Sequence, residues 1–319
     1  MKTTNIAVLS AWHVHAEEYA RAFAQVPGIK VCCLWDDDQE RGQEMAHKLD
    51  IPFVKDVDLI FADPDIRAVQ VTSATDQHED LMIAAARSGK HIFTEKVLTI
   101  GVEAGERVRA AIEDSSIQFA ISFPHLCRPA LLKAKAIADS GELGQIGYAR
   151  VRNAHNGAVA GWLPERFFDP AACGGGAMMD LGAHPMYTLA WLLGEPQKVQ
   201  STFTHMTGKQ VEDNAVSVLQ FPGGAIGVSE TSFVASHNPY TLELSGTKGS
   251  LLVRDQKVYV TSESTQGKPQ EVTGLPNAPA SPLHQFAEAL LSAKHVISDE
   301  FGIDKALRLT RIMSMAYAT

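Results

Sequence analysis

Short apolar runs alternate with segments of helical periodicity over about the first 120 residues. The apolar runs are Ile6–Leu9, Lys30–Trp35, Ala68–Thr72, His91–Thr94 and Ile117–Ile121. The helical segments between them are Ala16–Val26, Asp38–Leu49, Asp76–Ser88 and Val102–Ile112. Strand and helix in alternation indicate parallel strands joined by right-handed crossovers. The pattern therefore predicts a doubly wound Rossmann sheet, with a dinucleotide-binding domain over residues 1–122.

The pattern changes after Pro124, where strands begin to follow one another without intervening helices. A helix is expected over Pro129–Ser140 and a strand over Gly147–Ala154. The later strands are expected at Lys198–Thr207, Ala215–Phe221, Ala225–Phe233, Tyr240–Ser245, Ser250–Val253 and Lys257–Thr261, before closing helices at Pro282–Ala293 and Ile303–Tyr317. Runs of this kind predict a mostly antiparallel sheet covered on one face by helices. The fold class is α/β plus α+β, with an α+β domain over residues 123–319.

Composition narrows the class of partner. The chain has 319 residues, 45% hydrophobic and 20% charged, with a net charge of −9. That charge disfavours nucleic acid or an anionic membrane as the main partner. The sequence contains no run of about 18 apolar residues, the length that a membrane-spanning helix would need. The start passes directly into a strand without a signal-peptide pattern, and the four cysteines lack metal-site spacing, so a reducing cytoplasm is expected.

One stretch carries candidate chemistry, the glycine run 174–176 and the helix expected after it over about residues 175–193. Asp180 and His184 lie four residues apart on this helix, which rotates them by about 400° onto nearly the same face. A carboxylate beside an imidazole fixes its tautomer, as a general acid or base requires. Taken alone, such a pair is more often a solvated surface contact or a satisfied half-buried hydrogen bond than a catalytic pair.

The turn after the first strand is the expected dinucleotide site. Its residues are Ser10, Trp12, His13, Val14 and His15, with Ala11 between them, and none is glycine. The free N–H groups of the next helix still attract a phosphate, to which His13 or His15 would add a donor. Both histidines are alternatively simple loop caps. As metal ligands they lack a companion carboxylate nearby in sequence, and no metal site is predicted.

The second strand ends in an acidic triplet that begins at Asp36, 26 residues after Ser10. An acidic side chain at this position accepts hydrogen bonds from a ribose 2′-hydroxyl and repels a 2′-phosphate. Asp36 therefore favours NAD over NADP.

Several motifs together resemble the Gfo/Idh/MocA family of oxidoreductases. They are Phe93-Thr94-Glu95-Lys96, the segment Thr72–His78, the segment Ser140–Gly144, Asp213, the turn Gly246–Ser250 and the glycine run through His184. The resemblance covers essentially the whole chain. It implies a Rossmann domain joined to a mostly antiparallel domain, a nicotinamide cofactor, and a sugar, polyol or sugar derivative as substrate.

The resemblance also implies roles for individual residues. Lys96, Asp180 and His184 would be catalytic: the histidine exchanges the hydroxyl proton, the lysine polarises the oxygen, and the aspartate orients both. Cofactor contacts would extend to four further residues and to Lys96 itself. These four are Ser73, Ala74, His78 and Glu95. The open face of the second sheet would form a homodimer or homotetramer.

The chain departs from the family pattern around the cofactor. Val97 stands where the family has a proline, Ala74-Thr75 where it has Pro-Asn, and residues 123–129 lack the usual arginine placement. These departures indicate a divergent member with an unusual hold on its cofactor.

The loop before the catalytic helix supplies the substrate candidates, His155, Asn156, Trp162 and Arg166, whose polar groups and aromatic surface suit a sugar. The predicted function is hydride transfer between NAD and a secondary hydroxyl. Three alternatives stay open: a redox-neutral lyase or glycosidase that uses NAD transiently, a non-catalytic regulator, and a metal-dependent enzyme that uses His155, Asp180 and His184.

Overall fold

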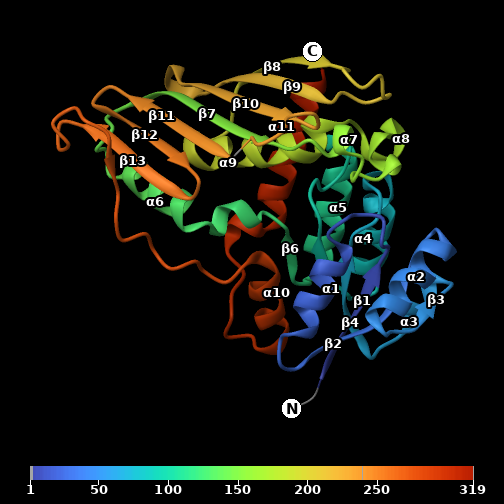
Figure 1. Ribbon diagram of the computed structural model, residues 1–319. Coiled ribbons are helices and arrows are strands. Elements are labelled where there is room, and N and C mark those ends of the chain that lie inside the picture. Colours follow the sequence, from blue (N-terminus) through green and yellow to red (C-terminus); the bar gives the residue numbers. More distant parts are fainter. Residues whose placement is uncertain (1–2, 239, 319) are drawn as a thin grey trace. The chain divides into compact units, whose positions relative to one another are not determined.

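The computed structural model describes residues 3–238 and 240–318, and its contacts divide them into two compact units (Figure 1). The first contains residues up to 122 together with residues 280–310, and the second contains residues 123–279 and those from 311 onward. Residues 280–310 therefore pack with the Rossmann sheet, whereas the sequence placed them in the second domain. Phe286 of this segment is fully buried, with its ring centroid 6.1 Å from that of Phe23 and 5.9 Å from that of Phe93.

The first unit is built on a six-stranded parallel sheet with the order β3-β2-β1-β4-β5-β6. Its strands are β1 (Thr4–Leu9), β2 (Ile29–Trp35), β3 (Phe53–Val54), β4 (Ile66–Val71), β5 (His91–Thr94) and β6 (Phe119–Ile121). Its helices are α1 (Ala16–Ala24), α2 (Gln39–Leu49), α3 (Val57–Ala62), α4 (His78–Arg87), α5 (Val102–Ser115) and α10 (Pro282–Leu291). This strand order is that of a Rossmann fold and confirms the predicted class.

The second unit contains an eight-stranded sheet with the order β14-β13-β12-β11-β7-β10-β9-β8. Its strands are β7 (Ile146–Ala154), β8 (Lys198–Thr204), β9 (Asn214–Gln220), β10 (Ile226–Ser232), β11 (Thr241–Gly246), β12 (Gly249–Arg254), β13 (Lys257–Ser262) and β14 (Gln270–Glu271). All neighbours are antiparallel except β7 and β10, which run parallel. The mostly antiparallel sheet that the sequence predicts is thus confirmed.

Helices cover one face of this second sheet. They are α6 (Pro129–Asp139), α9 (Ala183–Leu193) and a π-helical turn (Met178–Gly182), with the short α7 (Gly157–Ala160) and α8 (Pro170–Cys173) in the loop before them. Figure 1 shows α6 and α9 on the same face of the sheet. The helix α11 (Ile303–Tyr317) begins in the first unit and ends in the second.

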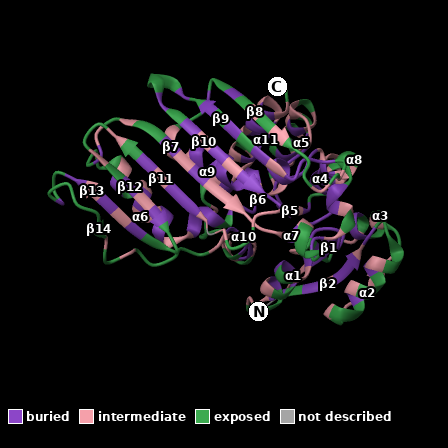
Figure 2. Cartoon of the chain, turned by 45° about the horizontal axis from the view of Figure 1, so that its top comes forward, coloured by how far each residue is buried: buried purple, intermediate pink, exposed green. Residues whose placement is uncertain are grey.

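The other face of the second sheet is open. Burial alternates along β9, where Ala215, Ser217 and Leu219 are buried while Val216 and Val218 are exposed (Figure 2). This period of two is typical of a strand with one buried face. Within the described part of the chain, no helix is long and apolar enough to cross a membrane.

Candidate functional site

The loop between β1 and α1 is hydrogen-bonded within itself and to the residues that follow β2 and β4. Ser10 has a φ of 72°, a conformation usual for glycine, and is fully buried. The amide of Ala11 donates to Asp36 Oδ2 (2.6 Å) and that of Trp12 to Ser10 Oγ (3.1 Å). The amide of His13 donates to the Thr72 carbonyl (2.9 Å). Amides that a glycine-rich loop offers to a pyrophosphate are therefore engaged within the protein.

Asp36 is equally committed. Its Oδ2 also accepts from Ser10 Oγ (3.1 Å) and Arg41 Nε (3.1 Å), while its Oδ1 accepts from the Asp38 amide (2.9 Å) and from Arg41 Nη2. A ribose hydroxyl would compete with Arg41 for these oxygens. The neighbouring Asp37 carboxylate is 43% exposed, and it accepts from Arg41 at 2.7 Å and from Gln77 at 2.9 Å.

The residues at this edge fit a dinucleotide by charge. Three carboxylates, Asp36 to Asp38, surround the single cation Arg41, so the end of β2 stays negative and repels a 2′-phosphate. At the start of α1, the side chain of His15 is 38% exposed and can act as a donor to a phosphate at the helix N-terminus. In this loop, side chains would contact the phosphates of a dinucleotide, whereas a glycine-rich loop contacts them with backbone amides.

Glu95 lies at the centre of a polar cluster in the first unit. Its Oε1 lies 2.6 Å from His15 Nδ1 and accepts from the Tyr19 hydroxyl at 2.6 Å, and its Oε2 accepts from the Lys96 amide at 2.6 Å. Burial raises the pKa of this carboxyl, but His13, the hydrogen bond to His15, and Lys96 outweigh burial. The pKa of Glu95 is held well below its usual range, and it is ionised at neutral pH.

The segment that carries Lys96 is held by the side chain of His78. Lys96 is 5% exposed and is joined to Val97 by a cis peptide bond. His78 Nδ1 lies 3.0 Å from the Val97 carbonyl oxygen and 3.1 Å from that of Leu98. Burial lowers the pKa of His78, so the ring is neutral and donates from Nδ1. Its position supports the Lys96 segment.

Ser73 and Ala74 follow β4 and are almost fully buried, at 2% and 4% exposure. Ser73 Oγ donates to the Ala74 carbonyl at 3.2 Å. The predicted cofactor contacts of the first unit thus lie at or just after the carboxyl ends of β1, β2, β4 and β5, where ligands of a doubly wound sheet bind.

In the second unit, the glycine run has a steric cause. Gly174 ends α8 with a φ of 74°. A Cβ at Gly175 would lie 2.1 Å from the Tyr317 hydroxyl, and one at Gly176 would lie 2.1 Å from the Glu212 carbonyl oxygen. Both distances are far inside van der Waals contact, so neither position accepts a side chain without local rearrangement.

Glu212 holds the start of the π-helical turn. Its buried carboxylate accepts from the amides of Gly176 (3.0 Å) and Met178 (2.9 Å) and from the Tyr317 hydroxyl (2.6 Å). A carboxylate here satisfies amides that a helix start leaves without intrahelical partners. Nothing in the sequence distinguished Glu212 from other acidic residues before a strand.

Asp180 lies within the π-helical turn, and His184 lies in the first turn of α9. The predicted element was a regular α-helix; the wider i→i+5 turn that the structure has instead changes the angle between the two side chains. Asp180 is partly exposed and His184 is 7% exposed. Turns of this kind occur frequently at functional sites.

Two residues that the sequence argument missed contact His184. The Tyr187 hydroxyl lies 2.8 Å from His184 Nδ1 and accepts from the His125 amide at 3.3 Å. The His125 ring stacks on that of His184, with centroids 4.2 Å apart and planes 23° apart. Tyr187 lies three residues after His184, a helical spacing that was available as a signal. The position of His125 depends on the tertiary fold.

The substrate candidates lie on the loop after β7. The His155 ring stacks on Phe233 at 5.2 Å and lies 4.5 Å from Trp162, which is 52% exposed. His155 Nδ1 accepts from the Gly157 amide at 3.0 Å, and Asn156 Nδ2 donates to Ser236 Oγ at 3.2 Å.

Arg166 lies further along this loop and is partly exposed, with its carbonyl accepting from Cys173 Sγ at 3.4 Å. Of the four candidates, His155 and Trp162 come together as an aromatic surface. Lys96 belongs to the first unit, whereas Asp180, His184 and these substrate candidates belong to the second.

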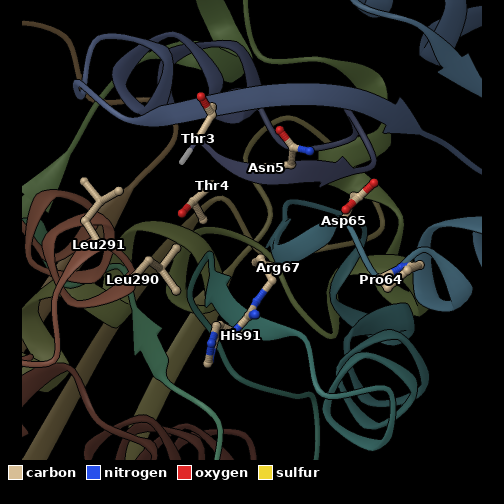
Figure 3. A pocket seen from close by; sticks show the side chains of 9 residues that line it. All are labelled: Thr3, Thr4, Asn5, Pro64, Asp65, Arg67, His91, Leu290 and Leu291. Carbon is tan, nitrogen blue, oxygen red and sulfur yellow. The ribbon is translucent and has the colours of Figure 1, made fainter. Parts of the chain in front are cut away.

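A cavity of about 330 Å³ lies at the opposite edge of the Rossmann sheet (Figure 3). Its wall contains Thr4 and Asn5 from the start of β1, Arg67 from β4, and His91 from the start of β5. Ligands of doubly wound sheets bind beyond the carboxyl ends of the strands, so this amino-end cavity is not the cofactor site.

A Rossmann unit of this strand order, followed by a second unit with a mostly antiparallel sheet, is the two-part architecture that the sequence predicted. Residues 6–123 match the profile described as oxidoreductase family, NAD-binding Rossmann fold, and residues 131–252 match the GFO/IDH/MocA C-terminal domain. The chain belongs to the GFO/IDH/MocA family. It is an NAD(P)-dependent dehydrogenase or reductase with NAD as cofactor, as the sequence predicted.

Two relatives illustrate the family. The scyllo-inositol 2-dehydrogenase (NAD(+)) of Bacillus subtilis (strain 168) is 28% identical over 298 residues, covering 89% of this chain and 84% of the relative. The 1,5-anhydro-D-fructose reductase of Ensifer adhaerens is 29% identical over 317 residues, covering 94% and 90%. The fold is similar to that of levoglucosan dehydrogenase in complex with NADH and levoglucosan, with a TM-score of 0.85, 21% identity, and coverage of 99% and 97%.

Proposed function

We propose that this chain transfers a hydride between NAD and a secondary hydroxyl of a sugar, polyol or sugar derivative. The observation that carries the proposal is the buried imidazole of His184, whose Nδ1 lies 2.8 Å from the Tyr187 hydroxyl, a contact that fixes the orientation of the ring. Relatives named as acting on inositol and anhydrofructose support the substrate class. When bound, NAD supplies the hydride acceptor or donor.

The remaining roles follow from the chemistry of an alcohol. Removing a hydride requires a base for the O–H proton and a cation for the developing alkoxide. We assign the proton to His184, the cation to Lys96, and the orientation of both to Asp180. His155 and Trp162 offer the aromatic surface on which a sugar ring stacks, with Asn156 and Arg166 as polar contacts.

The cofactor is held, in this proposal, by His13, Val14 and His15 at the start of α1 and by residues at the ends of β4 and β5. These residues are Ser73, Ala74, Glu95 and Lys96. Asp36 is the proposed acceptor for the ribose 2′-hydroxyl. Ser10 and Trp12 contribute to the cofactor site by shaping the loop after β1, and His78 supports the Lys96 segment. The functional division into a dinucleotide domain and a substrate domain falls at residue 122.

A screen of sugars, polyols and their acids for NADH formation tests the function, beside NAD and NADP binding titrations. With a substrate found, Lys96→Ala should abolish turnover and leave NAD binding largely intact, while Lys55→Ala, an exposed lysine of the same unit, should match the wild type. Undiminished turnover in Lys96→Ala would refute the assignment. Product release without net formation of NADH would favour a redox-neutral lyase or glycosidase. Binding of NAD without any turnover would favour a regulator.

The third alternative, a metal-dependent enzyme built on His155, Asp180 and His184, is not supported. Among the described residues, these three do not form a cluster with metal-ligand spacing.

We also propose that the open face of the second sheet forms a homodimer or homotetramer. It exposes Tyr148, Val216, Val218 and Ile226 at 38–44%. Ion pairs that Glu230 makes with Arg150 and Arg152 lie beside these side chains on neighbouring strands. An apolar patch next to paired charges suits a self-complementary contact. Val218→Lys should give a monomer by light scattering, and a monomeric wild type would refute the proposal.

We propose a cytoplasmic location, because the four cysteines form no disulfide with one another.

A further inference from the structure

The cluster around Glu95 contains three side chains with ligand chemistry. Among the described residues, His13, His15 and Glu95 form the group whose ligand atoms all lie within 4.8 Å of one another. His13 Nδ1 lies 3.8 Å from Glu95 Oε1, and His15 Nδ1 lies 2.6 Å from the same oxygen. Ligands of a tetrahedral zinc-type ion with bonds of about 2.0–2.1 Å are about 3.4 Å apart. The two distances bracket that value.

The fold supplies what the sequence lacked. His13 and His15 are two residues apart in the loop after β1, and their ring centroids lie 4.8 Å apart. Glu95 follows β5, 80 residues beyond His15, and reaches the pair because β1 and β5 both flank β4 in the parallel sheet. The companion carboxylate is therefore present in space although it is absent from the local sequence.

We propose that His13, His15 and Glu95 bind one divalent transition-metal ion of the zinc class. Two imidazoles and one carboxylate are a typical ligand set for such an ion, and three protein ligands leave a coordination position open. These three residues are also proposed cofactor contacts, but the ion-binding measurement needs no cofactor or substrate, and no step of the hydride transfer depends on the ion.

The surroundings resemble those of an oriented ligand set. Glu95 and His13 are 2% and 6% exposed, so their donor atoms are already desolvated. The Tyr19 hydroxyl donates to Glu95 at 2.6 Å and is itself 2.8 Å from Ser122 Oγ. Hydrogen bonds of this kind fix ligating carboxylates at metal sites.

Hydrogen bonds between protein groups occupy the positions that the ion would take. A proton joins His15 Nδ1 to Glu95 Oε1, and the His15 amide donates to His13 Nδ1 at 3.2 Å. The second bond is long and weak by geometry. Binding of the ion would replace these hydrogen bonds with metal–ligand bonds.

The test uses the full-length protein after chelation and dialysis. Co²⁺ is titrated and followed by its visible d–d absorption, and Zn²⁺ is titrated by calorimetry. We expect one ion per chain, and more than about tenfold weaker binding in His13→Ala and in Glu95→Gln. Tyr19→Phe should weaken binding about tenfold, as loss of an orienting partner does at other metal sites. His47→Ala, an exposed histidine of α2, should bind as the wild type does.

Three results would overturn the proposal. They are the absence of saturable binding at one ion per chain, wild-type affinity in Glu95→Gln, and an equal loss in His47→Ala, which would indicate adventitious histidine binding. Circular dichroism of each variant checks folding. If His13→Ala does not fold, the near-isosteric Glu95→Gln and Tyr19→Phe decide the question. Without an ion, the cluster is a proton-linked network only.

Discussion

Removal of the Tyr187 hydroxyl is the sharpest test of how His184 is oriented. Tyr187 is 2% exposed, and its ring packs 4.4 Å from that of Phe123, so Tyr187→Phe keeps the packing and deletes one oxygen. That oxygen makes two hydrogen bonds, to His184 Nδ1 at 2.8 Å and from the His125 amide at 3.3 Å. Their loss, with a buried amide left unsatisfied, should cost about 1–3 kcal/mol of unfolding free energy.

The effect on turnover should exceed the effect on binding. Without the hydroxyl, His184 Nδ1 loses the contact that holds the ring in one orientation, and misplacement of a catalytic group by about 1 Å can cost about 100-fold. We expect kcat/KM to fall about 10- to 100-fold, or about 1.4–2.7 kcal/mol in transition-state free energy. NAD affinity should be unchanged, because Tyr187 belongs to the second unit.

The assay measures initial rates of NADH formation with the substrate found in the screen, beside urea unfolding of each variant. Tyr240→Phe is the matched control, because Tyr240 is a tyrosine of the same unit whose hydroxyl donates to Thr188 Oγ1 at 3.4 Å. It also packs edge-on against His125 at 4.9 Å. Its loss should cost stability but not turnover. A Tyr187→Phe enzyme with wild-type kcat/KM, or equal losses in both variants, would refute the reasoning.

Three further predictions concern the stability of the protein and the affinity for NAD at the end of β2. Gly176→Ala should lower the unfolding free energy by about 1–3 kcal/mol, because its Cβ would lie 2.1 Å from the Glu212 carbonyl oxygen; equal urea midpoints would contradict this. Burial lowers the pKa of His78 in the folded protein. The contribution of His78 to the unfolding free energy is therefore complete at pH values above the pKa of histidine in the unfolded chain, about 6.5, and is lost as the pH falls below that value. Wild-type stability should therefore drop more than that of His78→Gln between pH 7.5 and 5.5, as measured by urea unfolding at each pH. Arg41→Ala frees Asp36 from its guanidinium and should change NAD affinity in binding titrations; unaltered affinity would place the ribose elsewhere.

The sequence predicted most of the fold because its apolar periods are long and undisturbed. The strand His91–Thr94 and the helix Ile303–Tyr317 have the predicted bounds. The two-residue strand Phe53–Val54 and the short helix Val57–Ala62 were missed, because such segments are too short to show a period. The parallel pairing of β7 with β10 depends on contacts between residues about 80 positions apart, which no local pattern specifies.

The candidate site was predictable where its residues are close in sequence. Asp180 and His184 lie on one helical segment, but the π-helical turn between them depends on Glu212, which lies more than 30 residues further along the chain. The spacing of His13 and His15 was visible, whereas the carboxylate beside them was not, because it comes from a different strand. Contacts between residues that only the sheet topology brings together could not be predicted from the sequence.

The position of α10 determines when the first unit can fold during synthesis. Residues 280–310 complete the first unit, and Phe286 packs against both Phe23 and Phe93. N-terminal domains usually fold first as a chain emerges from the ribosome. Here the Rossmann unit exposes apolar surface until the whole second sheet has been translated. A fragment that ends at residue 122 should therefore bind chaperones or aggregate, whereas a fusion of residues 1–122 to residues 280–310 should restore the missing cover.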